Sequence, residues 1–225
     1  MNRILVFDMD GVLVDVGESY RETIQRTVEH FTGRRVTRET IQEWKNRGGW
    51  NDDWALSTAM IRTEGVEVDS AAVVDYFQRL FLGGDGQPGL ILRERWVAHE
   101  GLFERLGRNY RLAVFTGRPR KEAELTLNRF AAGLRFDPIV GSDAVANHKP
   151  APDGLLHIAA LCPGSSLWYV GDTVDDARCA RAAGVPFIGI ASPSNPRRAE
   201  LVGLFEAENS IAVLEDINQL ESALP

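Results

Sequence analysis

Five short apolar runs, each ended by a polar or glycine-rich turn, constrain the fold of this chain more than any other feature of its sequence. Continuous apolar runs of this length are typical of parallel strands that are buried on both faces of a sheet. Amphipathic stretches of helical length, residues 120–130 and 175–183, lie between the later runs, and this alternation predicts a doubly wound α/β sheet. The predicted strands are residues 4–7, 112–115, 138–140, 167–170 and 187–190.

The stretch between residues 17 and 107 interrupts this alternation, because it contains no convincing strand and shows helical periodicity instead. An apolar stripe runs from Tyr20 to Phe31, and further helical windows are residues 37–47, 52–63, 70–82 and 93–106. Thr37, Asn51 or Asp52, and Asp69 are plausible N-caps for three of these windows. We therefore predict an α-helical domain at residues 16–90, inserted into a core domain of residues 1–15 and 91–225, with linker composition at residues 83–89.

Composition excludes several other classes of protein. The 225 residues suffice for a core domain with a smaller inserted one, and 44% hydrophobic and 25% charged residues are ordinary for a soluble globular protein. A net charge of −7 without a concentrated basic stretch argues against nucleic acid as a partner. The apolar run at residues 4–7 is too short for a signal peptide or a membrane span, so we expect a cytoplasmic protein, monomeric or homodimeric, without a membrane partner. Cys162 and Cys179 have no metal-like or redox-like spacing, which favours two reduced thiols.

The residues directly after the predicted strands are the candidate site residues, because an open parallel sheet binds ligands at the carboxyl ends of its strands. Asp8 and Asp10 follow the first strand two residues apart, so their side chains point to the same side of an extended backbone. Two such carboxylates repel each other, and a fold tolerates them beside a cation or a shared proton. Alternatively, one aspartate only ends the strand and caps a turn with Gly11.

The next two motifs supply a hydroxyl, a glycine turn and a lysine. Thr116 and Gly117 end a predicted strand, and a hydroxyl beside the N–H groups of a glycine turn suits a phosphate, although this threonine could also only cap a helix. Lys149 lies in a loop that Pro150 and Pro152 stiffen, where it could offset carboxylate charge and bind a phosphate oxygen. A lysine before a proline is also common in solvated surface turns.

The fourth motif is acidic. Asp172 follows a predicted strand, and Asp175 and Asp176 come next at a predicted helix N-terminus, where the helix dipole alone would favour acids. Carboxylates at strand ends, without a cluster of His or Cys, favour a hard cation such as Mg²⁺. Because the four motifs Asp-x-Asp-Gly, Thr-Gly, Lys-Pro and Gly-Asp-x-x-x-Asp converge on one sheet edge, we interpret them together as one catalytic site.

In this order the motifs resemble those of the haloacid dehalogenase superfamily, and the strand-free insertion resembles the helical cap of its phosphoglycolate-phosphatase-like branch. The resemblance covers essentially the whole chain. It implies an α/β core of Rossmann-like topology with an inserted cap domain. It also implies a magnesium-dependent phosphatase that acts on a small phosphorylated metabolite through a phospho-aspartate. Phosphoryl transfer of this kind depends on positioning and on neutralising the charge of the phosphoryl oxygens.

The resemblance implies a chemical role for each core residue. Asp8 would be the nucleophile, which splits hydrolysis into two easier displacements. Asp10 would be the general acid for the leaving alcohol and then the general base for water. Thr116 and the N–H of Gly117 would hold a phosphoryl oxygen, and Lys149 would neutralise charge at Asp8 and at the phosphate.

The resemblance also implies the metal ligands. They would be the carboxylates of Asp8 and Asp172 and the backbone carbonyl of Asp10. Asp176 matches the last acid of the fourth motif and would support the metal through its waters or through Lys149. Asp175 is an additional acid beside it, and the division of labour between the two remains open.

The predicted cap is expected to set specificity, since the core motifs contact only the phosphoryl group. Its most site-like stretch, residues 45–54, combines two glycines and two tryptophans with polar groups. Arg47, Trp50 and Asn51 are the candidate substrate-binding residues, and they suit a polar, perhaps ring-containing, substrate. Trp50 and Trp54 have helical spacing and could instead pack in the core of the cap.

Asp10 and Gly171 separate the phosphatase from alternative functions. Dehalogenases and phosphonate hydrolases of the superfamily lack an acid at the position of Asp10. Mutases similar to β-phosphoglucomutase share the Asp-x-Asp motif and the cap. They have Glu-Asp where this chain has Gly171-Asp172, so we prefer the hydrolase. The large insertion and Asp10 disfavour a receiver-type phospho-aspartate switch, and the complete set of motifs disfavours a non-catalytic binding module.

Overall fold

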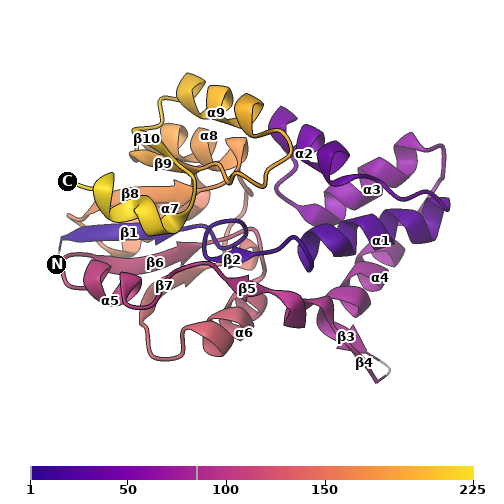
Figure 1. Cartoon of the computed structure of the whole chain (residues 1–225), viewed down its shortest axis with the longest axis horizontal. Helices are drawn as coiled ribbons and strands as arrows, with labels where there is room; N and C mark the ends of the chain where they lie inside the picture. The colour runs from indigo at the N-terminus through magenta and orange to yellow at the C-terminus, as the bar shows by residue number, and fades with distance from the viewer. Residues whose placement is uncertain (1, 85) are drawn as a thin grey trace.

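A six-stranded parallel sheet forms the centre of the computed structural model, which describes residues 2–84 and 86–225 (Figure 1). The strand order is β10-β9-β8-β1-β6-β7, and every neighbouring pair is parallel. The strands are β1 (Arg3–Phe7), β6 (Arg111–Phe115), β7 (Phe136–Val140), β8 (Ser166–Gly171), β9 (Phe187–Ile190) and β10 (Ala212–Leu214). The five predicted strands are present, and the predicted α/β fold is confirmed.

Helices cover both faces of this sheet. Leu5 and Phe7 of β1 pack in one apolar cluster, and Ile4 and Val6 pack in another, because successive side chains of a strand point to opposite faces. The first cluster includes residues of α5 (Leu102–Leu106), α6 (Arg120–Phe130) and the 3₁₀ helix η3 (Ile217–Ser222). The second includes residues of α7 (Asp153–Leu161), α8 (Val174–Ala183) and α9 (Arg198–Ala207). This is the doubly wound arrangement that the sequence predicts.

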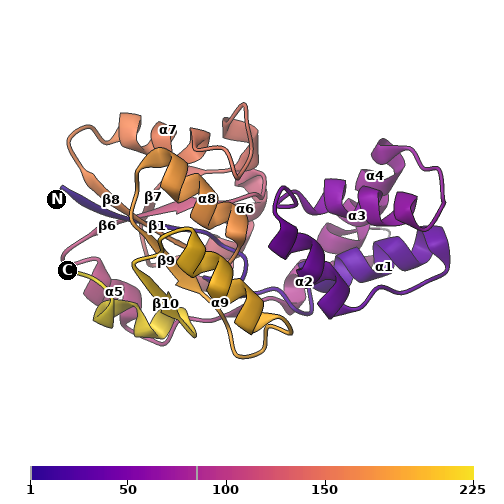
Figure 2. The same ribbon diagram turned by 90° about the horizontal axis from the view of Figure 1, so that it is seen from above.

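A second lobe consists of helices α1 (Tyr20–Thr32), α2 (Arg38–Arg47), α3 (Asp53–Thr63) and α4 (Ser70–Leu82), and we call these four helices the helical lobe (Figure 2). Thr37, Asp52 and Asp69 cap three of them, each accepting backbone N–H groups of the first turn. After α4 come the short hairpin of β3 (Gly83–Gly84) and β4 (Gln87–Pro88) and the 3₁₀ helix η1 (Leu90–Arg93). In the part of the chain that the structure describes, no helix is long and apolar enough to cross a bilayer.

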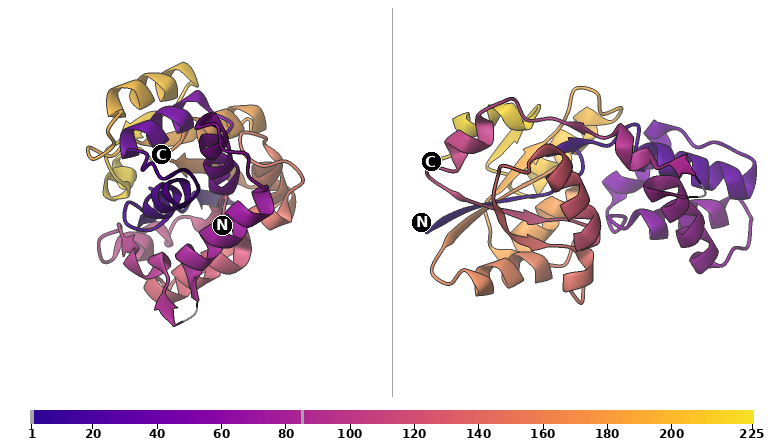
Figure 3. Two further views of the ribbon diagram at one scale, coloured as in Figure 1. Left: turned by 90° about the vertical axis from the view of Figure 1, so that its right-hand side faces the viewer. Right: turned by 90° about the horizontal axis from the view of Figure 1, so that it is seen from below.

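The chain passes between the two lobes twice, and the two passages pair with each other (Figure 3). They form the antiparallel strands β2 (Val14–Asp15) and β5 (Arg95–Trp96), with Val14 opposite Trp96. The carboxylate of Asp15 also binds Arg95 at 2.6 Å. The predicted domain boundaries, with a core of residues 1–15 and 91–225 and an inserted domain of residues 16–90, stay a prediction. The pairing of β2 with β5 marks where the backbone passes between the two lobes.

One predicted helix is wrong. Residues 93–106 form no continuous helix: η1 ends at Arg93, β5 follows, and α5 begins only at Leu102. Pairing with β2 keeps Trp96 extended, and Gly101 has a φ of 81°, which interrupts a right-handed helix. The sequence analysis also did not identify β10, an edge strand of three residues.

Candidate active site

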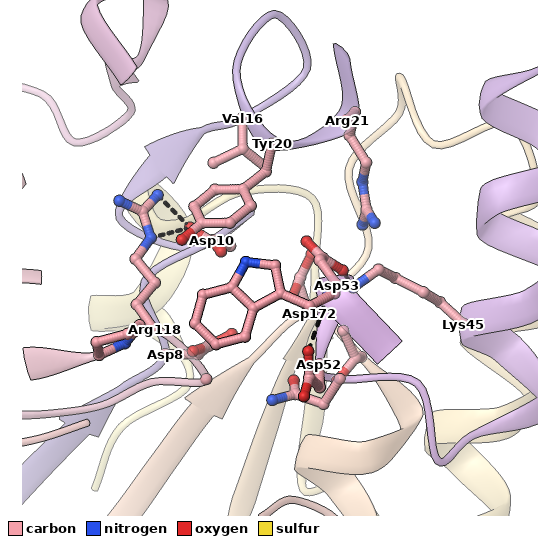
Figure 4. A pocket seen from close by; sticks show the side chains of 15 residues that line it. Asp8, Asp10, Val16, Tyr20, Arg21, Lys45, Asp52, Asp53, Arg118 and Asp172 are labelled. Carbon is pink, nitrogen blue, oxygen red and sulfur yellow. Dashed lines mark hydrogen bonds and ion pairs between the residues drawn. The ribbon is translucent and has the colours of Figure 1, made fainter. Parts of the chain in front are cut away.

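The carboxyl ends of β1, β6 and β8 face the helical lobe across a cavity (Figure 4). Both lobes line it. The core lobe contributes Asp8, Asp10, Gly117, Arg118, Pro119, Asp172 and Thr173. The helical lobe and the segment that leads into it contribute Val16, Tyr20, Arg21, Lys45, Asn51, Asp52, Asp53 and Trp54.

Asp8 and Lys149 form the centre of the site. Asp8 follows β1 directly and is 4% exposed, and its backbone N–H donates to the carbonyl of Val170 in β8. Lys149 Nζ lies 2.9 Å from Asp8 Oδ1 and 2.8 Å from Asp176 Oδ1. Burial raises the pKa of Asp8 to about 7, Lys149 acts against this rise, and Asp176 adds to it. Burial lowers the pKa of Lys149, but the carboxylates of Asp176 and Asp8 outweigh burial and raise it, so the lysine is charged.

Asp176 holds Lys149 in place. Its Oδ1 also accepts a hydrogen bond of 2.6 Å from the Tyr169 hydroxyl. Its Oδ2 accepts from the N–H and the hydroxyl of Thr173, which completes a capping box at the start of α8. Burial raises the pKa of Asp176, but Lys149 and the hydrogen bonds of Thr173 and Tyr169 lower it below its usual value. Both oxygens of Asp176 are therefore engaged by protein groups.

Asp172 differs from Asp176 because its carboxylate accepts no hydrogen bond from the residues that the structure describes. Carboxylate oxygens of Asp8, Asp172 and Asp176 lie within 4.8 Å of one another. Burial is the main reason that the pKa of Asp172 lies well above its usual value, and Asp8 and Asp176 raise it further. Among the described residues, Lys149 pairs with Asp8 and Asp176 but not with Asp172, so the cluster has more carboxylates than cations. An all-oxygen donor set with this charge fits a hard divalent cation.

Gly11 brings the backbone close to this cluster. It has a φ of 72°, and a Cβ at this position would lie 2.0 Å from Asp172 Oδ2. A side chain at residue 11 would therefore displace Asp172, which accounts for the glycine that ends the first motif.

Asp10 lies on the other side of the cavity and is held by Arg118. Arg118 Nε donates to Asp10 Oδ1 at 2.8 Å, and Nη2 contacts the same oxygen. The buried Arg118 follows Gly117 at the end of β6. The predicted pair of carboxylates, Asp8 and Asp10, is therefore present, and each member has its own cation.

The glycine turn and the helical lobe meet at Gly117. A Cβ at this residue would lie 2.4 Å from Nδ2 of Asn51, so a side chain here would require Asn51 to shift. Both residues line the cavity, and their predicted contact with substrate stays a prediction. Thr116 is buried behind them, and its hydroxyl accepts the N–H of Arg118 at 3.2 Å.

The structure does not place Arg47 and Trp50 among the residues that line this cavity, and their role in substrate binding stays a prediction of the sequence. Arg47 is exposed, pairs with Glu43 at 2.5 Å and lies over the ring of Trp44. Trp50 packs edge-to-face on Trp44, with ring centroids 4.9 Å apart. In contrast, Trp54 lines the cavity, although its helical spacing also allowed a place in the apolar core of the lobe.

Lys45 begins the stretch of residues 45–54 that is predicted to be site-like, but no sequence signal singled it out. The same is true of the cavity residues Arg21, Tyr20 and Arg118. Lys45 is buried and pairs with Asp53 at 2.6 Å. Roughly half a turn of helix separates the two alternatives in α2: Lys45 and Arg47 are two residues apart, so they face different sides of the helix. The rotation of α2 follows from its contacts with α8 and α9, which its own sequence does not reveal.

Asp175 has a role different from that of Asp176. Its carboxylate turns to the helical lobe, where it accepts the N–H of Gly49 at 2.8 and 2.9 Å and the N–H of Trp50 at 3.1 Å. Gly48 and Gly49 both have a left-handed φ, and a Cβ at Gly48 would lie 1.9 Å from Arg178 Nη1. The fourth motif thus joins the two lobes at Asp175 and holds the lysine at Asp176.

We expect Asp175→Ala to lower kcat/KM for small phosphate esters by about tenfold, since it removes three charge-assisted hydrogen bonds between the lobes. Asp175→Asn keeps one acceptor oxygen and should lie between Asp175→Ala and the wild type. Steady-state kinetics with both variants measures this effect. A kcat/KM of Asp175→Ala equal to that of the wild type would show that this contact does not contribute to the active arrangement.

Comparison with known proteins places the chain in a family. The sequence model of the haloacid dehalogenase-like hydrolases matches residues 3–184. A protein of Phytophthora nicotianae described as imidazoleglycerol-phosphate dehydratase is 34% identical over 84% of this chain, which spans only 43% of that relative. A phosphoglycolate phosphatase of Pseudomonas putida is 25% identical over 97% of this chain and 78% of its own length. The solved structure of a phosphatase from Thermococcus thioreducens is 27% identical, with a TM-score of 0.65 over 91% of this chain and 98% of that one.

The chain belongs to the haloacid dehalogenase-like hydrolase family. The predicted enzyme class, a phosphatase of this family, is confirmed by relatives that cover most of the chain.

Proposed function

We propose that the chain hydrolyses a small phosphate monoester in a Mg²⁺-dependent reaction, through a phospho-aspartate on Asp8. One observation carries this proposal: a buried Asp8, paired with Lys149, lies in the same cavity as the unbound carboxylate of Asp172 and the separately held Asp10. A cytoplasmic location and a monomeric or homodimeric state remain predictions of the sequence.

In the proposed reaction Asp8 attacks the phosphorus atom and Asp10 gives a proton to the departing alcohol. Asp10 then accepts a proton from the water that hydrolyses the acyl phosphate. Lys149 favours the ionised form of Asp8 and offers charge to a phosphoryl oxygen, while the glycine turn at Gly117 offers backbone N–H groups. Asp8, Asp172 and the carbonyl of Asp10 would hold Mg²⁺, which supplies positive charge to the phosphoryl group when bound.

The helical lobe is proposed to recognise the organic part of the substrate. Of the cations that line the cavity, Lys45 is paired with Asp53 and Arg118 with Asp10. The guanidinium group of Arg21 makes no ion pair or hydrogen bond with the residues that the structure describes, and Figure 4 shows Arg21 among the side chains that line the cavity. An unpaired guanidinium suits a second anionic group on the substrate, such as the carboxylate of phosphoglycolate. The Pseudomonas putida relative is named for a phosphatase of this compound.

Gly171 supports a hydrolase over a mutase. A Cβ at residue 171 would lie 2.5 Å from Cβ of Asp176. Mutases similar to β-phosphoglucomutase have a glutamate at this position. A glutamate here would therefore require Asp176 and its partner Lys149 to move. The arrangement found here fits the glycine.

Metal removal tests the proposal directly. We expect EDTA to abolish p-nitrophenyl phosphate hydrolysis and Mg²⁺ to restore it, whereas Ca²⁺ should inhibit because it prefers more ligands in a looser geometry. A panel of phosphate esters with and without a carboxylate should show a preference for the carboxylate that Arg21→Gln removes. Full activity in metal-stripped buffer would contradict the proposed metal site.

A further inference from the structure

Arg118 is the largest side chain that is fully buried in the described part of this chain. It stands in the loop between β6 and α6, directly after Gly117. A guanidinium group without water is costly unless charged and hydrogen-bonding partners surround it. The groups that bind the guanidinium of Arg118 therefore indicate the role of this buried residue.

Two carboxylates and one hydroxyl surround the guanidinium. Besides Asp10, it binds Glu94 Oε1 through Nη2 at 2.6 Å and Thr126 Oγ1 through Nη1 at 2.9 Å. The Thr126 hydroxyl in turn donates to Glu94 Oε2 at 2.8 Å. The side chain of Glu94 is 0% exposed, whereas that of Asp10 is 28% exposed and faces the cavity. Glu94 and Thr126 thus fix Arg118 from the inside, and Arg118 fixes Asp10 at the edge of the cavity.

The helical lobe closes the remaining side of the guanidinium. The ring of Tyr20 lies 4.7 Å from Arg118 Cζ, and its hydroxyl binds Glu122 of α6 at 2.5 Å. Stacking of this kind favours a guanidinium over an ammonium group. The planar group is therefore restrained in rotation as well as in position.

Only one oxygen of Asp10 takes part in this network. Both hydrogen bonds from Arg118 reach Oδ1, and Oδ2 accepts none from the residues that the structure describes. The restraint leaves one carboxylate oxygen free, on a residue that lines the cavity (Figure 4). A group that must exchange a proton with the leaving oxygen requires this fixed direction.

We infer that Arg118 is a positioning residue that directs the free oxygen of Asp10 toward the leaving group, with Glu94 and Thr126 holding the guanidinium. This inference rests on the proposed function, because it gives a purpose to the proton transfer assigned to Asp10. Lysine cannot replace arginine here, since one ammonium group cannot span Asp10, Glu94 and Thr126 at once.

The test measures the rate of Asp8 phosphorylation in a single turnover, with an alkyl phosphate and with p-nitrophenyl phosphate. The alkoxide needs a proton to leave, whereas p-nitrophenolate leaves without one. Arg118→Lys should slow the alkyl phosphate at least about tenfold more than p-nitrophenyl phosphate, the same selectivity that Asp10→Asn should show. In the Asp10→Asn background, Arg118→Lys should cause no further selective loss.

Glu94→Gln provides a second variant that keeps the size of the side chain and only loosens the guanidinium. It should show the same selectivity at a smaller amplitude, with a circular dichroism spectrum like that of the wild type. Equal losses for both substrates in both variants, or losses that add to those of Asp10→Asn, would show a purely structural role and overturn the inference. Failure of the wild type to release phosphate would instead overturn the proposed function, so the two failures are distinguishable.

Discussion

Asp8→Asn is expected to lower phosphate release by at least about a thousandfold while leaving the fold intact. The amide has the size of the carboxylate, and its oxygen can still accept the hydrogen bond that Lys149 makes at 2.9 Å. It has no negative charge with which to attack phosphorus. Because burial and Asp176 already disfavour the charge on Asp8, removing it should not destabilise the protein, and the melting temperature should stay the same or rise.

Two measurements check this expectation: intact-protein mass spectrometry and the rate of phosphate release. Intact-protein mass spectrometry after rapid acid quench should find a phosphorylated species in the wild type and none in Asp8→Asn. Asp8→Glu serves as the matched control, since it keeps the charge but moves the carboxylate by one methylene group. Turnover of Asp8→Asn near the wild-type rate would contradict the covalent mechanism.

The elements that the sequence predicted well are those whose signals are local. Asp8 and Asp172 each come directly after an apolar run, and the parallel pairing of β1 with β8 brings the ends of those runs together. Burial of both faces of the sheet requires such runs, so the strand and the motif after it could be recognised together. The same holds for Asp52 and Asp69, which cap helices through N–H groups two or three residues away.

The relations that the sequence could not reveal join distant segments. Arg118 meets Asp10 across 108 positions of the sequence and Glu94 across 24. Asp175 meets Gly49 across 126 positions. No periodicity or spacing predicts such partners, and an acid beside Asp176 is equally expected from the helix dipole. The predicted helix of residues 93–106 includes Glu94 because its buried partner, Arg118, lies too far along the sequence to influence a local pattern.

Lys149→Met is expected to damage both stability and catalysis. Lys149 is the cation between Asp8 and Asp176, and its ammonium nitrogen packs on the rings of Phe115 and Tyr169, 4.7 and 5.4 Å from their centroids. Methionine keeps that packing but leaves two buried carboxylates without their cation, a change that typically costs about 3–5 kcal/mol. For a protein of this size the melting temperature should fall by roughly 6–20 °C.

The sign of the pH dependence follows from the same contacts. Lys149 lowers the pKa of Asp8, which burial raises to about 7, so its removal raises that pKa further. A larger fraction of Asp8 is then protonated near neutral pH and cannot attack. The acidic limb of the activity profile should move to higher pH, and turnover near pH 7 should fall by about 10²–10³-fold.

A double variant separates this mechanism from a general loss of packing. In Asp8→Asn, one of the two carboxylates that Lys149 neutralises is already absent, so adding Lys149→Met should cost less stability than in the wild-type background. Thermal unfolding of the four proteins in this cycle measures the difference. If the two losses simply add, the charge of Asp8 does not contribute to the effect of Lys149, and the ion pair seen between them has no energetic consequence.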